Sequence, residues 1–538
     1  MKIIPFSVCI GVALLGSIAC GSSSKPGSVI STAGSGPEPS TGGASGGTAP
    51  VLNNFAGTGN VDIKTDVGGA ASSDPSSCDP NNGKTTISGV VYDPAGKNPL
   101  YNISVFVVDP TSPLPDLDTI PVACGCSQLL PAKVRAISKP TDTSGHFTID
   151  CAPSGNVSIV VQTGKWRRQY DNVTVLPNQD NVIPNLRLPA NSSEGSLPNI
   201  AISTGGSDSF ECLPLRLGVS ASEYVAGSGT GGHIHIYTGL RGATPATGTV
   251  ESYKTLWDTQ EHLNEHDVVI LSCEGAETTG GNPGMRVSAA QQQYLMNYAN
   301  AGGRVFASHY HYAWFNTGPF ATGANNLATW APGMGSIDDT QSFPAEIDTT
   351  LAGNAAFPEG SALLTWLGLV GALTNNQLPV WFARNNVKAV VSPPSTEWMH
   401  LAPSVMRAAS APQYFSADTP IGAAAAGNPV CGRVVYSALH VSGGPNTNAP
   451  GVPVDYPAGG TAGAGAGGAS GTAGAGGGGF GLPGNPPGGG FGQMQGGTVP
   501  SGCAMHPLTP QEEALEFMFF DLSSCLVPVG QNPPEVPK

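Results

Sequence analysis

The sequence predicts a multidomain protein: an all-β sandwich followed by an α/β domain with a doubly wound, mostly parallel sheet. Between residues 85 and 190, short β-branched runs are separated by Gly- and Pro-containing turns, which is typical of a sandwich. Between 195 and 455, apolar runs alternate with helical segments, which is typical of an α/β sheet. Long Gly-rich segments are too poor in apolar residues to fold alone, so we expect them to be disordered.

The composition limits how much of the chain can form a packed core and which classes of partner the protein can bind. Only 11% of the 538 residues are charged, whereas 74 are Gly and 48 are Pro, so much of the chain cannot form a packed core. The formal net charge is -15, and the one basic cluster is Lys165–Arg168. Nucleic acids and anionic membrane surfaces need a basic face, so we expect neither as a direct partner.

The first 20 residues are typical of an export signal. Lys2 precedes an apolar run from Ile3 to Ala19, which is short for a membrane-spanning helix. The end of the run, Ser17–Cys20, resembles the bacterial lipobox, in which the Cys becomes the lipidated first residue of the mature protein. Ser17 departs from the usual Leu, which leaves plain secretion as an alternative. The resemblance implies membrane anchoring through Cys20, at the cell outer membrane or cell surface.

The folded domains are flanked and interrupted by low-complexity sequence. Residues 21–84 should be a disordered tether, and residues 456–500 an insertion within the α/β domain. Structure should resume at 501–527, where Thr509 and Glu512 form a capping box ahead of an apolar stripe. We therefore expect a final helix that packs onto the sheet.

The predicted sandwich carries a family resemblance. Gly89–Asp93, Thr141–Phe147 and Pro153–Gly155 resemble the strand and turn motifs of the carboxypeptidase regulatory-like, or transthyretin-like, domain. The resemblance covers about a hundred residues. It implies a fold and a spacer, adhesive or sugar-facing role, but no reaction.

The α/β domain is organised around a βαβ unit between Asp267 and Phe315. Asp267–Ser272 and Arg304–Ser308 are apolar strands, and the helix between them starts at Ser288 with a capping box. Such a unit makes its strands parallel, and ligands bind beyond the carboxyl ends of parallel strands. The residues at those ends are the candidate site: Cys273, Glu274, His309, Tyr310 and His311.

The same domain resembles the class I glutamine amidotransferase-like superfamily, in particular its trehalose-utilisation-protein-like branch. The resemblance rests on Asp267–Ser272, on the segment from Ser288 to Val305, and on Gly432–His440. The family's active members carry a Gly-x-Cys-x-Gly nucleophile elbow, where this chain has Ala307–His311. Without that cysteine and those glycines, and with Val-Ser after His440 in place of the family's His-x-Glu, glutaminase chemistry is not expected.

Two functions and a purely structural role remain open, so the sequence does not decide whether the protein is an enzyme. The first is ligand binding without turnover or cofactor, with a cell-surface or extracellular glycan as a candidate and His311, Tyr310 and Trp314 as contacts. The second is a metal-dependent or Cys-His hydrolase at the same rim. Its candidate catalytic residues are Cys273, Glu274, His309 and His440, and its candidate ligands for zinc or iron are His309, His311 and His235.

The cysteines are expected to form disulfides, since the protein is predicted to be exported. Besides Cys9 and Cys20, nine are present, so at least one thiol is left over. We expect Cys124 or Cys126 to bridge to Cys151. For Cys273, a bridge to Cys212 or simple packing competes with a role as a displaced nucleophile.

Overall fold

A computed structural model describes residues 84–275, 287–332, 335, 337–441, 499–500 and 503–526. This part of the chain is rich in β-strands arranged in several sheets, with a smaller number of helices and a multidomain-like organisation. None of its helices has the length and apolarity needed to cross a membrane. The expected signal peptide, Cys20, the tether up to residue 83 and nearly all of the 456–500 insertion lie outside these ranges.

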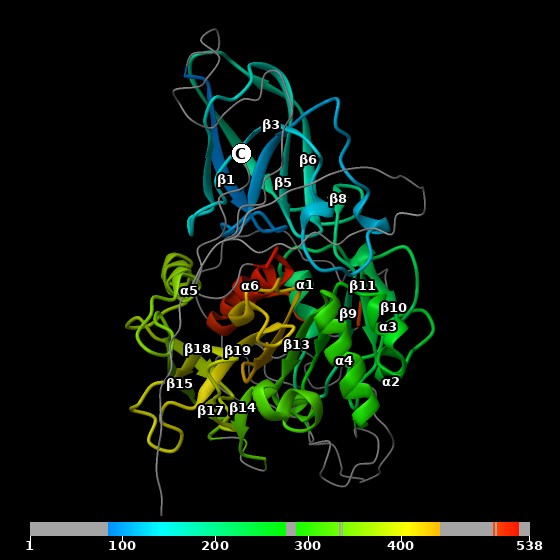
Figure 1. The fold of residues 1–538 in the computed structure, drawn as a ribbon, viewed down its shortest axis with the longest axis vertical. Helices are drawn as coiled ribbons and strands as arrows, with labels where there is room; N and C mark the ends of the chain where they lie inside the picture. Colours follow the sequence, from blue (N-terminus) through cyan, green and yellow to red (C-terminus); the bar gives the residue numbers. More distant parts are fainter. Residues whose placement is uncertain are drawn as a thin grey trace, which may run out of the picture. The chain divides into compact units, whose positions relative to one another are not determined.

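The first eight strands form two sheets, which we call the N-terminal sheets (Figure 1). One has three strands in the order β4-β1-β7, and the other has five in the order β3-β2-β5-β6-β8. Buried β-branched and aromatic side chains such as Ile87, Val105 and Trp166 make their core. The strands are β1 Thr86–Tyr92, β2 Ser104–Val108, β3 Val134–Ile137, β4 His146–Ile149, β5 Gly155–Thr163, β6 Trp166–Val175, β7 Asp180–Arg187 and β8 Gly195–Ser196.

A ten-stranded sheet follows, in the order β10-β11-β9-β12-β13-β20-β19-β18-β15-β16. Its first six strands pair in parallel, as expected for apolar runs buried on both faces. The last four extend it with antiparallel pairs. The strands are β9 Ile200–Ser203, β10 Tyr224–Ala226, β11 Ile234–Tyr237, β12 Val268–Leu271, β13 Arg304–Ser308, β15 Ser342–Ile347, β16 Leu378–Trp381, β18 Ser395–Leu401, β19 Pro412–Thr419 and β20 Gly432–Ser437.

The sequence also predicts a strand of this sheet at Val387–Ser392, and the structure places it elsewhere. The run beginning at Val387 forms β17 (Val387–Val390), which pairs with β14 (Ala328–Trp330) in a separate two-stranded sheet. Lys388 and Ala389 are exposed, so β17 is not buried on both faces. The prediction of a strand was right, and its place in the main sheet was wrong.

Local sequence explains the central helix, α4 (Ala289–Ala301). The Ser288 hydroxyl accepts a hydrogen bond from the Gln291 backbone, and the Gln291 side chain caps Ser288 in return. Gly302 ends the helix at φ 126°, a conformation that favours glycine. The predicted capping box and stop are confirmed. The other helices are α1 Leu213–Arg216, α2 Tyr253–Leu256, α3 Gln260–Asn264, α5 Pro358–Leu369 and α6 Pro510–Ser523.

The final helix, α6, joins the N-terminal sheets to the ten-stranded sheet (Figure 1, red). Its predicted capping box between Thr509 and Glu512 is present. The Phe519 and Phe520 rings pack edge-on against Trp166 of β6. The side chain of Gln511 accepts a hydrogen bond from the Trp381 backbone at the end of β16. The helix therefore packs on the sheet as expected, and also completes the core of the first eight strands.

The disulfides connect segments far apart in the sequence. Cys124 is bonded to Cys431 and Cys126 to Cys525, over separations of 307 and 399 residues. The expected bridge from Cys124 or Cys126 to Cys151 is therefore wrong. Both cysteines lie in one loop, but each is bonded to a different, distant segment of the chain. Cys212 is bonded to Cys503.

Candidate functional site

Three neighbouring strands deliver the candidate residues to one edge of the ten-stranded sheet. β12 and β13 are parallel, with Leu271 opposite Ala307, and β13 and β20 are parallel, with Ser308 opposite Ser437. The expected parallel βαβ geometry is thus confirmed. Segments 273–274, 309–311 and 438–441 leave the sheet together at its carboxyl edge.

His309 occupies a sharp turn between β13 and the 3₁₀ helix η7 (His309–Trp314). Its φ is 39°, a left-handed conformation that costs a non-glycine residue about 1–3 kcal/mol and is concentrated at functional sites. The turn is held by Asp208, which accepts hydrogen bonds from the Ser308 hydroxyl at 2.5 Å and the Val441 amide at 2.8 Å. This strained turn, which we call the elbow, places an imidazole at the end of β13.

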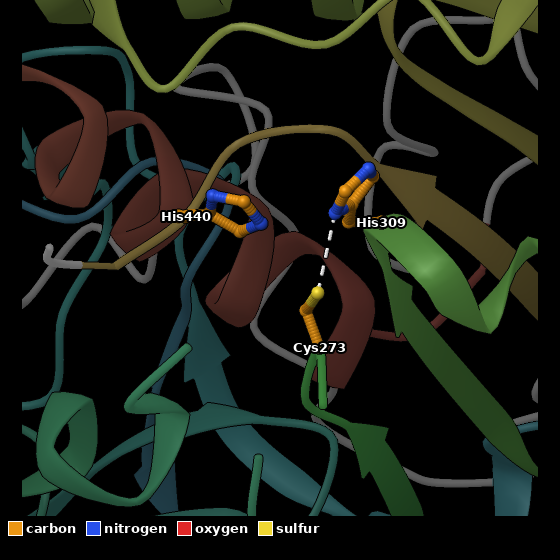
Figure 2. A group of neighbouring side chains, drawn as sticks. All are labelled: Cys273, His309 and His440. Carbon is orange, nitrogen blue, oxygen red and sulfur yellow. Dashed lines mark hydrogen bonds between the residues drawn. The ribbon is translucent and has the colours of Figure 1, made fainter. Parts of the chain in front are cut away.

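The ring of His309 connects a thiol to an amide. Its Nδ1 lies 3.2 Å from Cys273 Sγ (Figure 2). Its Nε2 lies 2.9 Å from Asn386 Oδ1. Because an amide oxygen only accepts, Nε2 carries the ring proton and Nδ1 presents a lone pair to the thiol. All three side chains are buried. The arrangement is a Cys–His–Asn relay, the constellation that thiol hydrolases use.

Burial keeps the resting pair uncharged. It raises the pKa of Cys273 to about 12, against partial opposition from the backbone amides of Tyr310 and Gly275, which stabilise the thiolate. Burial and the Arg384 guanidinium hold the pKa of His309 well below its usual range. The ground state is therefore a neutral thiol beside a neutral imidazole.

His440 is the third member of this group. Its ring centroid lies 5.3 Å from that of His309 in an edge-to-face arrangement, and burial holds its pKa well below the usual range. One donor atom each from Cys273, His309 and His440 lies within 4.8 Å of the other two (Figure 2). The Nε2 atom of His440 is buried and has no hydrogen-bond partner. The protein has thus placed an unused imidazole nitrogen beside the Cys–His pair.

Glu274 is also at this edge but faces other residues. Its Oε1 packs against the backbone of Gly239. Any side chain at position 239 would place its Cβ only 2.8 Å from that oxygen. Neither carboxyl oxygen has a hydrogen bond of normal geometry, and burial raises the pKa to about 8 although the Leu240 amide opposes this. Glu274 is not among the grouped donors of Cys273, His309 and His440. It is therefore a neutral, buried acid at neutral pH.

Three of the other expected site residues, His311, His235 and Trp314, are not brought to the cluster. His311 donates from Nε2 to the Ser272 carbonyl at 2.9 Å and accepts from Trp314 Nε1 at 3.2 Å, so both ring nitrogens are used in the core. His235 lies on β11, bonded to the Gly227 carbonyl and packed against His266. The expected metal set of His309, His311 and His235 is therefore not assembled. Trp314 is buried, whereas Tyr310 is partly exposed and its ring packs on His309.

Unsatisfied polar groups gather at this edge. Buried polar groups in folded proteins are normally hydrogen-bonded, so each exception needs an explanation such as a catalytic role or a bound group. Among the described residues, several buried side chains with such atoms lie at or just beyond the ends of β9, β12 and β20, or before β17. They are Ser203, Ser272, Glu274, Asn386 and His440.

No pattern in the sequence marks Asn386 or Asp208 as a functional residue. Asn386 is 77 residues after His309, and its neighbour Asn385 has the same side chain. A second possible metal-holding group, Asp348, Glu397 and His400, lies on and beside the antiparallel strands. That group is partly exposed and separate from the Cys–His–Asn relay.

Comparisons with known proteins leave the family open. No family model and no curated protein matches the chain. The solved structures that match include two cohesin–X-dockerin complexes from Acetivibrio cellulolyticus. The first is 14% identical, and the match covers 23% of this chain and 78% of that chain at a TM-score of 0.14. The second is 15% identical, and the match covers 28% of this chain and 88% of that chain at a TM-score of 0.15. The major pilin subunit BcpA of Bacillus cereus is 12% identical, covering 20% and 30% at 0.13. TM-scores this low carry no inference about fold or function.

Proposed function

We propose that the ten-stranded-sheet part of this protein is a thiol-dependent hydrolase of carbonyl compounds such as esters, thioesters or amides. The observation that carries the proposal is the Cys273–His309–Asn386 relay, with contacts of 3.2 Å and 2.9 Å. A base within hydrogen-bond reach of a nucleophile, itself oriented by a third group, is the signature of covalent catalysis. The strained elbow at His309 supports it.

The relay sets the course of the reaction. Because the resting thiol is neutral, the sulfur–carbonyl bond forms as the thiol proton passes to His309 Nδ1. The protonated ring then gives that proton to the leaving alkoxide, thiolate or amine, leaving a thioester on Cys273. Water, activated by the same nitrogen, hydrolyses the thioester and restores the thiol. Asn386 keeps the ring oriented through both proton transfers.

Substrate must reach a sulfur that is fully buried. The Tyr310 ring covers His309 with a centroid distance of 3.9 Å, and it is the partly exposed residue of the predicted set. We infer that displacement of the Tyr310 side chain admits the substrate. The sulfur then becomes less buried, which lowers its pKa and eases proton transfer.

The wider setting is also part of the proposal. We infer that the ten-stranded sheet is a doubly wound, amidotransferase-like domain, supported by its parallel half and by the elbow after β13. The N-terminal sheets would then be a carboxypeptidase regulatory-like sandwich acting as a spacer. Lipidation of Cys20 would hold both at the outer membrane or cell surface. The disulfides support export to an oxidising compartment.

The test is covalent trapping on the mature protein. Incubation with p-nitrophenyl acetate should release nitrophenolate with a burst and add one acetyl group to the peptide containing Cys273, seen by mass spectrometry. Cys273→Ser should abolish the adduct, and His309→Ala should slow the burst by on the order of 10²–10⁴-fold. His262→Ala, at a partly exposed histidine of α3, is the matched control. An unchanged burst in Cys273→Ser would refute the hydrolase and favour ligand binding without turnover.

A further inference from the structure

We propose that Cys273, His309 and His440 also form a site for one zinc ion, and that the bound ion holds the thiol inactive. The silencing role rests on the proposed hydrolase, whereas the site itself does not. Zinc is bound in proteins by thiolate and imidazole ligands, and three protein ligands with an open fourth position are a common set. This set replaces the His309, His311 and His235 combination that the sequence suggested.

The donor spacing is close to what zinc requires. Zinc–sulfur and zinc–nitrogen bonds of about 2.3 and 2.0 Å place tetrahedral ligand atoms roughly 3.5 Å apart. Cys273 Sγ and His309 Nδ1 are already 3.2 Å apart, and all three donors lie within 4.8 Å of one another. The His440 ring lies beside the Cys273–His309 pair, as a third ligand of the same ion requires (Figure 2).

The hydrogen bonds around the cluster leave the correct lone pairs free. Asn386 engages Nε2 of His309, so Nδ1 is the nitrogen available to a metal, the support that ligating histidines usually have. His440 Nε2 is buried and has no partner. His311, two residues from His309, has both nitrogens in hydrogen bonds and so cannot join. The orphaned His440 nitrogen is the independent observation that points to a ligand.

The balance of charge is consistent with a reversible site. Binding follows Cys273–SH + Zn²⁺ → Cys273–S⁻–Zn²⁺ + H⁺, which adds one net positive charge to a buried region. The positive charge of Arg384 interacts electrostatically with Cys273, His309 and His440 and disfavours the added positive charge. The Asp208 carboxylate near Cys273 favours the added positive charge. These opposed neighbours predict weaker binding than at a structural zinc site, as a removable inhibitor requires.

Zinc at this position would block the proposed reaction directly. The ion would occupy the sulfur lone pair that attacks the carbonyl and the Nδ1 lone pair that accepts the proton. Removal of zinc would restore the neutral Cys–His pair.

Zinc alone is the probe for the test. Mature protein stripped with a chelator should take up one zinc per chain by calorimetry and elemental analysis. Cys273→Ser and His440→Ala should each weaken binding at least tenfold, and His400→Ala, in the separate Asp348–Glu397–His400 group, should not. The proposed site would be refuted if the wild-type protein took up no zinc. It would also be refuted if His400→Ala lost zinc uptake while Cys273→Ser and His440→Ala kept it.

A second measurement avoids dependence on folded variants. In the wild-type protein, zinc should slow iodoacetamide modification of Cys273, mapped by mass spectrometry, and chelator should reverse the protection. Equal modification with and without zinc would contradict the proposal. Zinc uptake without an acetyl adduct in the stripped protein would leave the metal site standing and remove the hydrolase. An acetyl adduct without zinc uptake would do the reverse.

Discussion

The Nε2 atom of His309 lies 2.9 Å from the Oδ1 atom of Asn386, joining the end of β13 to the residue that precedes β17. This one bond fixes which ring nitrogen faces Cys273. The tautomer it selects is the one that a general base needs and also the one that a zinc ligand needs.

Replacing Asn386 with Ala should therefore damage both stability and activity. The buried Nε2–H would lose its acceptor, at a cost of about 1–3 kcal/mol in the free energy of unfolding. The ring would also lose its fixed tautomer, so we expect kcat/KM for ester hydrolysis to fall about 100-fold. Denaturant unfolding and steady-state kinetics measure the two effects. Asn385→Ala is the control, since the Asn385 side-chain oxygen has no partner; equal effects in both variants would contradict the role of Asn386.

The Cys273 thiol should respond to pH as a strongly buried group. Burial raises the pKa of Cys273 to about 12. At every pH below that value, raising the pH by one unit should therefore increase the thiolate fraction about tenfold. Between pH 7 and 10, iodoacetamide modification of the zinc-free protein should climb with that slope. In urea-unfolded protein the rate should level off near the ordinary thiol pKa of about 8.5. A plateau near pH 8.5 in the folded protein would show an activated thiolate instead.

Glu274→Gln should stabilise the protein increasingly as the pH rises. Burial raises the pKa of Glu274 from 4.5 to about 8. A raised pKa means that the fold favours the protonated form, so the stability it contributes is full below about pH 4.5 and is lost as the pH rises through about 8. Gln mimics the protonated acid at every pH. By denaturant unfolding we expect the variant and the wild type to agree near pH 4.5 and to differ by a few kcal/mol near pH 8.

The matched control for this prediction is Glu261→Gln, an exposed position on α3. It measures the effect of removing an exposed carboxylate over the same pH range. A difference from the wild type that stays constant with pH for Glu274→Gln would mean that Glu274 is ionised in the folded protein, with a partner that balances it.

Removing the bridge between Cys126 and Cys525 should weaken the fold. Disulfides that close long loops contribute about 2–4 kcal/mol, and this one spans 399 residues. We expect the lower end in the double variant to Ser, because the Cys124–Cys431 bridge already constrains the same loop. Denaturant unfolding without reductant measures the loss. An unchanged midpoint would mean that the remaining bridge and helix α6 suffice.

Local signals in the sequence predicted local structure well. The capping boxes at Ser288 and Thr509 and the parallel pairing of β12 with β13 are all confirmed. Each depends on neighbours in sequence or on the handed connection of a βαβ unit. The close approach of Cys273 and His309 follows from that unit alone.

What the sequence could not predict depends on long-range contacts. Asn386 reaches His309 only because of where the β14–β17 pair lies, and no pattern marks it out from Asn385. The partners of Cys124 and Cys126 lie more than 300 residues away, and spacing says nothing about such pairs. Glu274 and His311 were expected at the shared rim but face other contacts, because successive residues leaving a strand point in different directions.

Helix α6 closes the core of strands made more than 300 residues earlier, since Phe519 and Phe520 pack on Trp166. A chain that emerges amino end first would therefore present the Trp166 face uncovered until nearly its whole length has been delivered. The Cys126–Cys525 bond can form only at the same late moment. Assembly of the first eight strands would then be finished by the last helix, and a chain interrupted before residue 510 should be open to proteolysis throughout.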